Sequence, residues 1–99
     1  MKVGTILSGT WGATMVIPEF FKVTRVMPKT FEVVELGKRM LTPNANGQQG
    51  YEVPDESKVG EKRIGKANDY GGYTIYAKYK MKLWVDEWDG KGVWADYMD

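Results

Sequence analysis

The stretch of sequence that decides the fold lies between residues 73 and 85 and reads Tyr73-Thr74-Ile75-Tyr76-Ala77-Lys78-Tyr79-Lys80-Met81-Lys82-Leu83-Trp84-Val85. Its odd-numbered positions are all apolar or aromatic, whereas lysine occupies three of the even-numbered ones. Because successive side chains of a β-strand point to opposite faces, this period of two predicts one long extended strand. The odd-numbered side chains are expected to face the core, and the three lysines are expected to line up outside.

Shorter strands are expected along the rest of the chain, since glycines and prolines interrupt it at short intervals. We predict strands at Val3–Ser8, Phe20–Met27, Thr30–Leu41, Tyr51–Val53, Glu61–Ala67 and Val93–Tyr97, with a β-bulge at Val33-Val34. Turns are expected at Pro28-Lys29, Asn68–Gly72 and Asp86–Gly92, a single helical turn at Pro54–Ser57, and a polar loop at Thr42–Gly50.

A chain of 99 residues with this pattern is expected to fold as a single domain, residues 1–99. Several short strands leave unpaired edges unless their sheet closes on itself. We therefore predict an all-β fold: a small antiparallel barrel, SH3-like or OB-like, with at most one short helical turn. A two-sheet sandwich is the alternative. Tryptophan is costly to expose, so at least two of the four tryptophans are expected in the core.

The composition argues against catalysis. The chain has no His and no Cys, which removes the commonest general base, the thiolate nucleophile and two frequent metal ligands. Neither serine, Ser8 or Ser57, lies in a Gly-x-Ser-x-Gly turn. The protein is therefore predicted not to be an enzyme and to use no cofactor or metal. Asp86, Glu87 and Asp89 offer a remaining acid–base or Mg²⁺ option, for which a solvated turn is the simpler interpretation.

Charge is segregated along the chain. Residues 58–82 carry seven basic and two acidic side chains, whereas residues 83–99 carry one basic and five acidic ones. We predict a partner-binding surface made of the lysine row, its flanking aromatics and the basic residues before it: Lys78, Lys80, Lys82, Tyr76, Trp84, Lys62 and Arg63. Such a surface suits a nucleic-acid backbone with stacked bases, or an acidic protein. The alternative is a solvent-facing strand whose lysines discourage edge pairing.

Several short motifs recur in a known group of proteins: Gly4, Trp11-Gly12, Phe21-Lys22-Val23, Tyr73-Thr74-Ile75 and Trp88-Asp89-Gly90-Lys91. On these motifs the chain resembles a loosely defined group of small, mostly uncharacterised β proteins from phages and other mobile elements. Those proteins open with a Trp-Gly turn and close with a Trp-Asp-Gly-Lys turn. The resemblance implies a phage accessory protein with a compact β fold, and it carries no catalytic activity with it.

A phage accessory protein without catalytic groups is expected to act by binding. We expect a non-enzymatic inhibitor of a host defence factor, such as a nuclease or a CRISPR effector: an anti-CRISPR-type antagonist in the host cytoplasm. The alternatives are a small barrel that binds nucleic acid directly and a sponge for a signalling nucleotide. No membrane association is expected. The oligomeric state stays open, with a homodimer through an exposed edge strand as one option. The polar loop Thr42–Gly50 is expected to join the contact surface.

Overall fold

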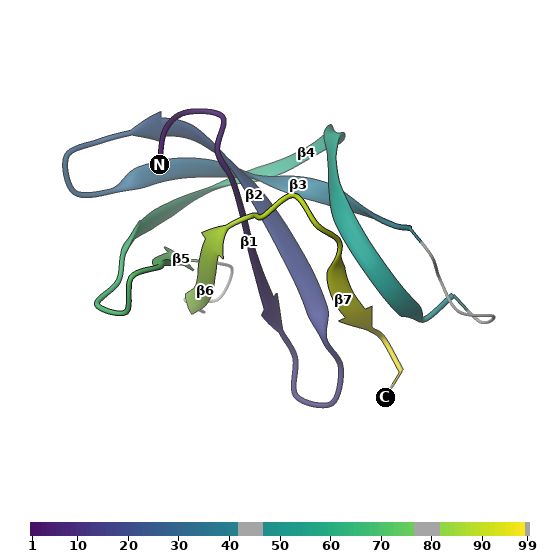
Figure 1. Ribbon diagram of the computed structural model, residues 1–99. Coiled ribbons are helices and arrows are strands. Elements are labelled where there is room, and N and C mark those ends of the chain that lie inside the picture. The colour runs from purple at the N-terminus through teal and green to yellow at the C-terminus, as the bar shows by residue number, and fades with distance from the viewer. Residues whose placement is uncertain (42–46, 77–81, 99) are drawn as a thin grey trace.

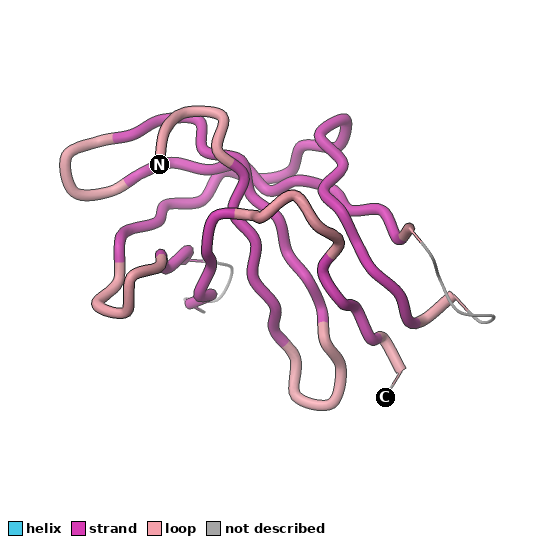
Figure 2. The backbone as a smooth tube through the Cα atoms, viewed as in Figure 1, coloured by secondary structure: helices cyan, strands magenta, loops and turns pink. Residues whose placement is uncertain are grey.

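The structure is a computed structural model that describes residues 1–41, 47–76 and 82–98. These residues form strands and no helix: β1 (Ile6–Trp11), β2 (Ile17–Val26), β3 (Phe31–Met40), β4 (Gln49–Ala67), β5 (Tyr73–Tyr76), β6 (Lys82–Glu87) and β7 (Val93–Asp96). Figures 1 and 2 show a strongly curved sheet from which the β1–β2 hairpin extends. The predicted all-β class is confirmed.

The sheet closes on itself. Each strand from β1 to β5 pairs antiparallel with the next one in sequence. β6 then returns to β1 through the pairs Leu7–Glu87 and Ser8–Asp86. The result is a ring of six antiparallel strands, so the predicted small antiparallel barrel is confirmed. When the sheet closes, the two edge strands pair with each other, so their backbone N–H and C=O groups are not left unpaired. This is the physical reason for a barrel in preference to an open sheet.

β7 extends the sheet beyond this ring. It pairs with the first residues of β4, from Gln49 to Glu52. Its last residue, Asp96, also exchanges two backbone hydrogen bonds with Val16, of 2.8 and 2.9 Å, just before β2. The predicted last strand, Val93–Tyr97, is therefore confirmed to within one residue, and its partners are β4 and the start of β2.

The ring encloses an apolar core of eight buried side chains: Leu7, Phe21, Val23, Phe31, Val33, Ile75, Leu83 and Val85. Tyr73 packs against this core, and its ring meets that of Phe31 edge to face at 5.5 Å. Gly65 lies under the same ring, where a β-carbon would come within 2.5 Å of Phe31. Phe20 is also fully buried but faces the other side of β2, where its ring lies 6.1 Å from that of Trp88.

A buried polar contact joins the end of the chain to β4. The carboxylate of Glu52 is only 3% exposed, and the hydroxyl of Tyr97 donates a hydrogen bond to its Oε1. Lys38 lies over the Tyr97 ring, with its Nζ 5.8 Å from the ring centroid, and donates a hydrogen bond of 2.6 Å to the carbonyl of Pro18. Burial and the hydrogen bond to Glu52 both raise the pKa of Tyr97, so its hydroxyl keeps its proton.

The prediction of one continuous strand over residues 73–85 is wrong. The structure has two strands, β5 and β6, which pair antiparallel in the order Tyr73–Val85, Thr74–Trp84, Ile75–Leu83 and Tyr76–Lys82. The chain therefore reverses direction between Tyr76 and Lys82. Pairing the two short strands satisfies their backbone hydrogen bonds inside the barrel, which one extended strand without a second partner would leave unmade. The inward direction of the odd-numbered side chains is confirmed where it is described, since Ile75, Leu83 and Val85 are all buried.

The expected helical turn at Pro54–Ser57 is also wrong, because β4 runs as one strand from Gln49 to Ala67. The pairing of β3 with β4 jumps from Leu36–Val59 to Gly37–Asp55, so residues 56–58 bulge out of register. Gly37 makes room for this bulge, since a β-carbon there would lie 2.6 Å from the Cβ of Lys58. A further register shift lies between Val34 and Leu36, next to the bulge predicted at Val33-Val34.

The other predicted boundaries differ by a few residues. β1 begins at Ile6 and continues through Gly9 to Trp11, whereas the prediction ended the strand at Ser8. Gly9 is needed in this strand because a β-carbon there would lie 2.4 Å from the carbonyl oxygen of Trp84. The missing side chain thus lets β1 cross closely over β6. The turns at Pro28-Lys29 and Asn68–Gly72 are confirmed.

Candidate functional site

The outward face of β5 and β6 carries three of the predicted partner-binding residues. Tyr76 lies opposite Lys82 across the β5–β6 pair, and Trp84 lies opposite Thr74 one row further along. Residues two apart on a strand share a face, so Tyr76, Lys82 and Trp84 lie on the same side of the sheet. Lys78 and Lys80 lie outside the described residues.

Tyr76 is flanked by two lysines from neighbouring strands. The Nζ of Lys66 on β4 lies 5.7 Å from the centroid of the Tyr76 ring, and the Nζ of Lys82 lies 6.0 Å from it. A hydrogen bond to Tyr76 raises the pKa of Lys66, which therefore stays protonated. The described part of this basic surface is thus the Tyr76 ring between two lysines. Lys66 was not among the residues predicted from the sequence, and the pairing of β4 with β5 brings it there.

Lys62 and Arg63 are engaged with carboxylates on β3 and β4. Lys62 Nζ lies 3.7 Å from Oε1 of Glu32. Arg63 pairs with Glu35 at 3.0 Å and with Glu61 at 2.9 Å, and its side chain is only 13% exposed. Neighbouring residues on a strand point to opposite faces, so Lys62 and Arg63 do not share one surface. Arg63 is partly buried and tied to these two carboxylates, and it does not join Tyr76 and Lys82.

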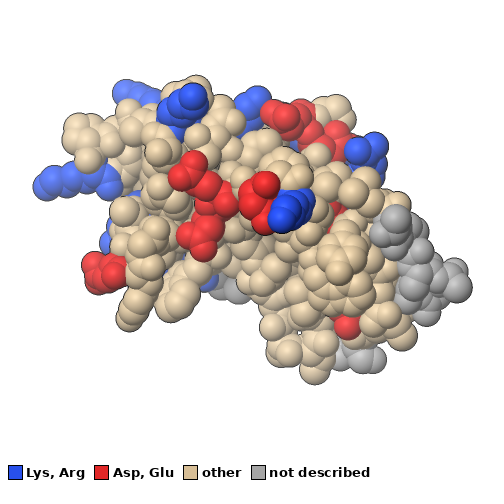
Figure 3. Space-filling model, in the orientation of Figure 1, with Lys and Arg blue, Asp and Glu red and all other residues tan. Residues whose placement is uncertain are grey.

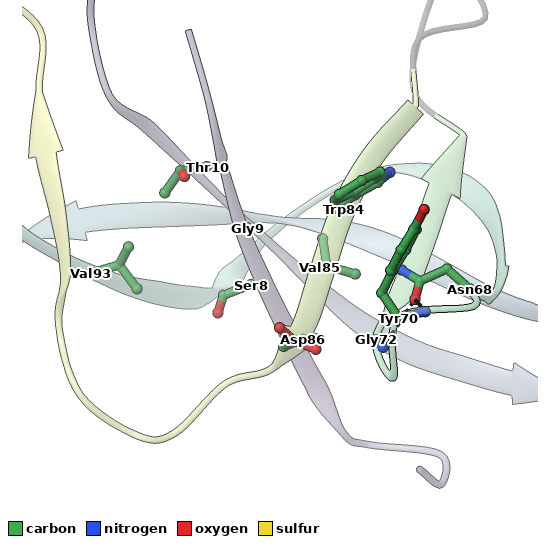
Figure 4. Close-up of a pocket in the computed structure, with 10 residues that line it drawn as sticks. All are labelled: Ser8, Gly9, Thr10, Asn68, Tyr70, Gly72, Trp84, Val85, Asp86 and Val93. Carbon is green, nitrogen blue, oxygen red and sulfur yellow. Dashed lines mark hydrogen bonds between the residues drawn. The ribbon is translucent and has the colours of Figure 1, made fainter.

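Trp84 belongs to an aromatic pair. Its side chain is 63% exposed and that of Tyr70 is 81% exposed. The two ring centroids lie 5.5 Å apart with an angle of 30° between the ring planes, so the rings form one tilted stack. Figure 4 shows both rings rising side by side, Trp84 from β6 and Tyr70 from the turn that follows β4. The sequence prediction included Trp84 but missed Tyr70, because their proximity depends on the pairing of β5 with both β4 and β6.

The turn that carries Tyr70 is fixed by Asn68. The Oδ1 atom of Asn68 accepts hydrogen bonds from the backbone N–H groups of Tyr70, at 2.9 Å, and Gly72, at 3.1 Å. The backbone N–H of Asn68 donates to the carbonyl of Gly72 at 3.0 Å. Gly71 has a φ of +87°, a conformation that glycine adopts without strain. The Asn-Asp-Tyr-Gly-Gly sequence is rich in turn-forming residues, so the exposure of Tyr70 in a turn could have been predicted from it.

An open pocket of about 500 Å³ adjoins the aromatic pair. It is lined from β1 by Ser8, Gly9 and Thr10, from the turn by Asn68, Tyr70 and Gly72, from β6 by Trp84, Val85 and Asp86, and from β7 by Val93. Figure 4 shows the carboxylate of Asp86 on the same strand as Trp84, between β1 and the turn. Its lining is as polar as it is apolar, so it differs from the largely apolar, enclosed pockets that are typical of small-molecule sites.

Glycine shapes the pocket. A β-carbon on Gly72 would lie 2.6 Å from Oδ1 of Asp86. Because glycine has no side chain, the Asp86 carboxylate can occupy this position. In the described part of the chain, no cation pairs with Asp86. Figure 3 shows acidic side chains near the centre of the face it views, with a basic side chain beside them, and side chains of both signs around its margins. The carboxylate is therefore free to accept hydrogen bonds from a ligand.

The acidic side chains of residues 86–89 do not converge on one point. Asp86 and Glu87 are adjacent on β6 and point to opposite faces, whereas Oδ1 of Asp89 accepts a hydrogen bond of 2.9 Å from the backbone N–H of Lys91. Trp88 Nε1 closes the same turn by donating to the carbonyl of Lys91 at 2.7 Å. Among residues 1–41, 47–76 and 82–98, no three potential metal-ligating side chains come together.

The expectation that two tryptophans lie in the core is wrong. Trp11, Trp84 and Trp94 are 45%, 63% and 43% exposed, and Trp88 is half-buried. Trp94 packs edge to face against Tyr51, with ring centroids 5.4 Å apart. Phenylalanines and branched aliphatic residues fill the barrel interior instead. The surface therefore presents more aromatic area than the sequence prediction assumed.

The polar loop predicted at Thr42–Gly50 is described only in part. Residues 42–46 lie outside the described ranges, and Gln49 and Gly50 belong to β4, where they pair with β7. Nothing in the described part of the chain forms a helix long and apolar enough to span a membrane. The chain matches no protein-family model, no curated protein and no solved structure.

Proposed function

We propose that this protein is a non-enzymatic binding protein that recognises another protein through the pocket beside Trp84. The exposure of Trp84 and Tyr70, at 63% and 81%, carries the proposal. Trp and Tyr are enriched among the residues that dominate the binding energy of protein interfaces, and each buries a large apolar area. Both rings sit on ordered backbone, a paired strand and an Asn-capped turn, so the surface is organised before a partner arrives.

The partner that we propose is a host defence factor, a nuclease or a CRISPR effector, that the protein inhibits by covering a working surface. Support comes from the resemblance to small phage β proteins and from the segregation of charge between residues 58–82 and 83–99. The lack of His and Cys supports inhibition by occupancy in preference to chemical modification.

The test compares two exposed tryptophans in one binding assay. Tagged protein is used as bait in host lysate, and each captured protein is then purified and titrated against the wild type, Trp84→Ala and Trp94→Ala. We expect Trp84→Ala to weaken binding by at least about tenfold, as for a central interface aromatic. Trp94→Ala, whose ring packs on Tyr51 away from the pocket, is the matched control and should bind like the wild type. Equal binding by both variants would contradict the proposal.

A second candidate function, direct binding of single-stranded nucleic acid, is favoured by the position of Tyr76 between Lys66 and Lys82. An aromatic ring can stack on a base while flanking lysines neutralise phosphates. A signalling nucleotide would use the same contacts on a smaller scale.

A gel shift with a single-stranded oligonucleotide at two salt concentrations tests this candidate, and a thermal-shift screen tests nucleotides. If the candidate holds, affinity falls steeply with salt, and the double change Lys66→Glu and Lys82→Glu abolishes it. Affinity that does not change with salt, or that survives the double change, contradicts it.

A further inference from the structure

We propose that the pocket beside Trp84 receives an arginine side chain of the protein partner, with the guanidinium group between the aromatic pair and the carboxylate of Asp86. This inference rests on the proposed function and names the chemistry that the site would recognise. It follows from three properties of the pocket: an aromatic wall, a carboxylate that pairs with no described cation, and a polar edge on β1.

The aromatic wall and the carboxylate are correctly spaced for one flat cation. Trp84 and Asp86 are two residues apart on β6, so they share a face with their Cα atoms about 6.5–7 Å apart. A guanidinium is planar, stacks on an indole or phenol face, and presents paired N–H donors at its edge to a carboxylate. One group can therefore contact the Tyr70–Trp84 stack with its face and Asp86 with its edge.

The charge around the pocket favours a cation over an anion. Asp86 is exposed and, among the described residues, is the only charged side chain that lines the pocket. A phosphate in the pocket would face the Asp86 carboxylate, which repels it. The same argument separates this pocket from the surface around Tyr76, where Lys66 and Lys82 supply positive charge.

The remaining walls suit arginine better than lysine. Val93 offers apolar contact to a methylene chain, and the hydroxyls of Ser8 and Thr10 can accept further N–H donors. An arginine has five such donors in fixed positions, whereas a lysine ammonium is compact and more strongly hydrated. The site is open, so it admits a side chain that projects from a larger partner.

The experiment titrates the full-length protein with short, otherwise neutral peptides that carry one arginine, one lysine or one citrulline. Citrulline matches arginine in shape but lacks its charge. Binding is followed at low ionic strength by the NMR signals of the tryptophan indole N–H groups and the backbone amides. We expect the arginine peptide to shift the Trp84 indole signal saturably, the lysine peptide to bind several-fold more weakly, and citrulline to cause no saturable shift.

Two variants that remove one negative charge each complete the test. Asp86→Asn should weaken binding of the arginine peptide by about tenfold, because a charge-assisted hydrogen bond is lost. Glu87→Gln makes the same change at the next residue, on the opposite face of β6, and should leave the affinity within about twofold. Equal shifts with arginine and citrulline, or unchanged affinity of Asp86→Asn, would overturn the inference.

A nucleotide probe tests whether the pocket binds a nucleotide instead of an arginine side chain. If adenosine or guanosine monophosphate shifts the Trp84 indole and the arginine peptide does not, the arginine assignment is wrong. Loss of partner binding in Trp84→Ala together with no response to arginine would leave the proposed function standing and remove only this inference. No loss in Trp84→Ala would remove the proposed function itself.

Discussion

The hydroxyl of Tyr97 donates a hydrogen bond to the carboxylate of Glu52, which is 3% exposed. This contact fastens the end of the chain to β4, at the point where β7 extends the barrel. A buried carboxylate is tolerated only when it is hydrogen-bonded, so the pair acts as one structural unit.

Removing the hydroxyl should therefore destabilise the fold. We expect Tyr97→Phe to lower the free energy of unfolding by about 2 kcal/mol, because Glu52 is left buried without its donor. Urea unfolding followed by tryptophan fluorescence measures the change. Adding Glu52→Gln to that variant should restore part of the loss, since an amide is less costly to bury unpaired than a carboxylate. A change below about 0.5 kcal/mol in Tyr97→Phe would show that water satisfies Glu52 instead.

The same contact predicts a pH dependence. The pKa of Tyr97 is raised in the folded protein above its ordinary value of 10.0, mainly by burial and then by Glu52. The folded state thus holds the phenol proton more tightly than the unfolded state does. Its stabilising effect is complete below pH 10 and is lost as the pH rises above that value. Unfolding midpoints measured between pH 8 and pH 11 should fall more steeply for the wild type than for Tyr97→Phe. Parallel curves would contradict this assignment.

Gly65 should not tolerate a side chain. A β-carbon there would lie 2.5 Å from the ring of Phe31 and 2.8 Å from Cδ1 of Ile75, both in the closed core. We expect Gly65→Ala to cost about 1–3 kcal/mol through overpacking. Gly60→Ala on the same strand is the control, since a β-carbon there would meet Glu35 at 3.1 Å (Oε2) and 3.2 Å (Cβ), contacts that a shift of a few tenths of an ångström relieves. A similar loss in both variants would point to glycine flexibility and not to core packing.

The β5–β6 hairpin can be tested by cross-linking. The chain has no cysteine, so the double change Tyr76→Cys and Lys82→Cys introduces one possible disulfide. Residues directly opposite on paired strands have Cβ atoms about 4.5–5.5 Å apart, which a disulfide spans, whereas one extended strand would hold these two about 20 Å apart. We expect an intramolecular disulfide under mild oxidation, detected by mass spectrometry. The pair Tyr76→Cys and Asp86→Cys should not form a disulfide. Equal disulfide formation in both double variants would contradict the register of β5 against β6.

Exposure of Trp84 predicts that the fold does not depend on it. We expect Trp84→Ala to change the free energy of unfolding by less than about 1 kcal/mol, as for a mostly solvated side chain. Phe20→Ala should cost about 3–5 kcal/mol, because that ring is completely buried. Thermal and urea unfolding of both variants measure the difference. A large loss in Trp84→Ala would mean that the stack with Tyr70 supports the turn instead of serving a partner.

The hairpin also explains one failure of the sequence prediction. The β5–β6 pairs join Tyr73 to Val85 and Ile75 to Leu83, so odd-numbered residues face odd-numbered ones across the pair. Paired residues in an antiparallel sheet point to the same face. The alternation of core and surface is therefore the same for one long strand and for this hairpin, and no pattern of period two distinguishes them.

The merging of three predicted segments into β4 has a different cause. Pro54 and the polar residues after it favour a turn locally, yet β3 offers a long pairing edge that continues past them. A bulge at residues 56–58, accommodated by Gly37, lets the strand proceed. Pairing between distant segments overrode the local preference here.

The sequence by itself determined the all-β class, most strand positions and the inward direction of residues such as Ile75 and Val85, because alternating side chains and turn residues act locally. Only the tertiary structure decided that β6 closes the sheet on β1, that Arg63 is held by Glu35 and Glu61, and that Trp84 meets Tyr70 beside Asp86. Those relationships depend on strand order and register. Both are set by contacts between residues far apart in the chain, which a local pattern does not contain.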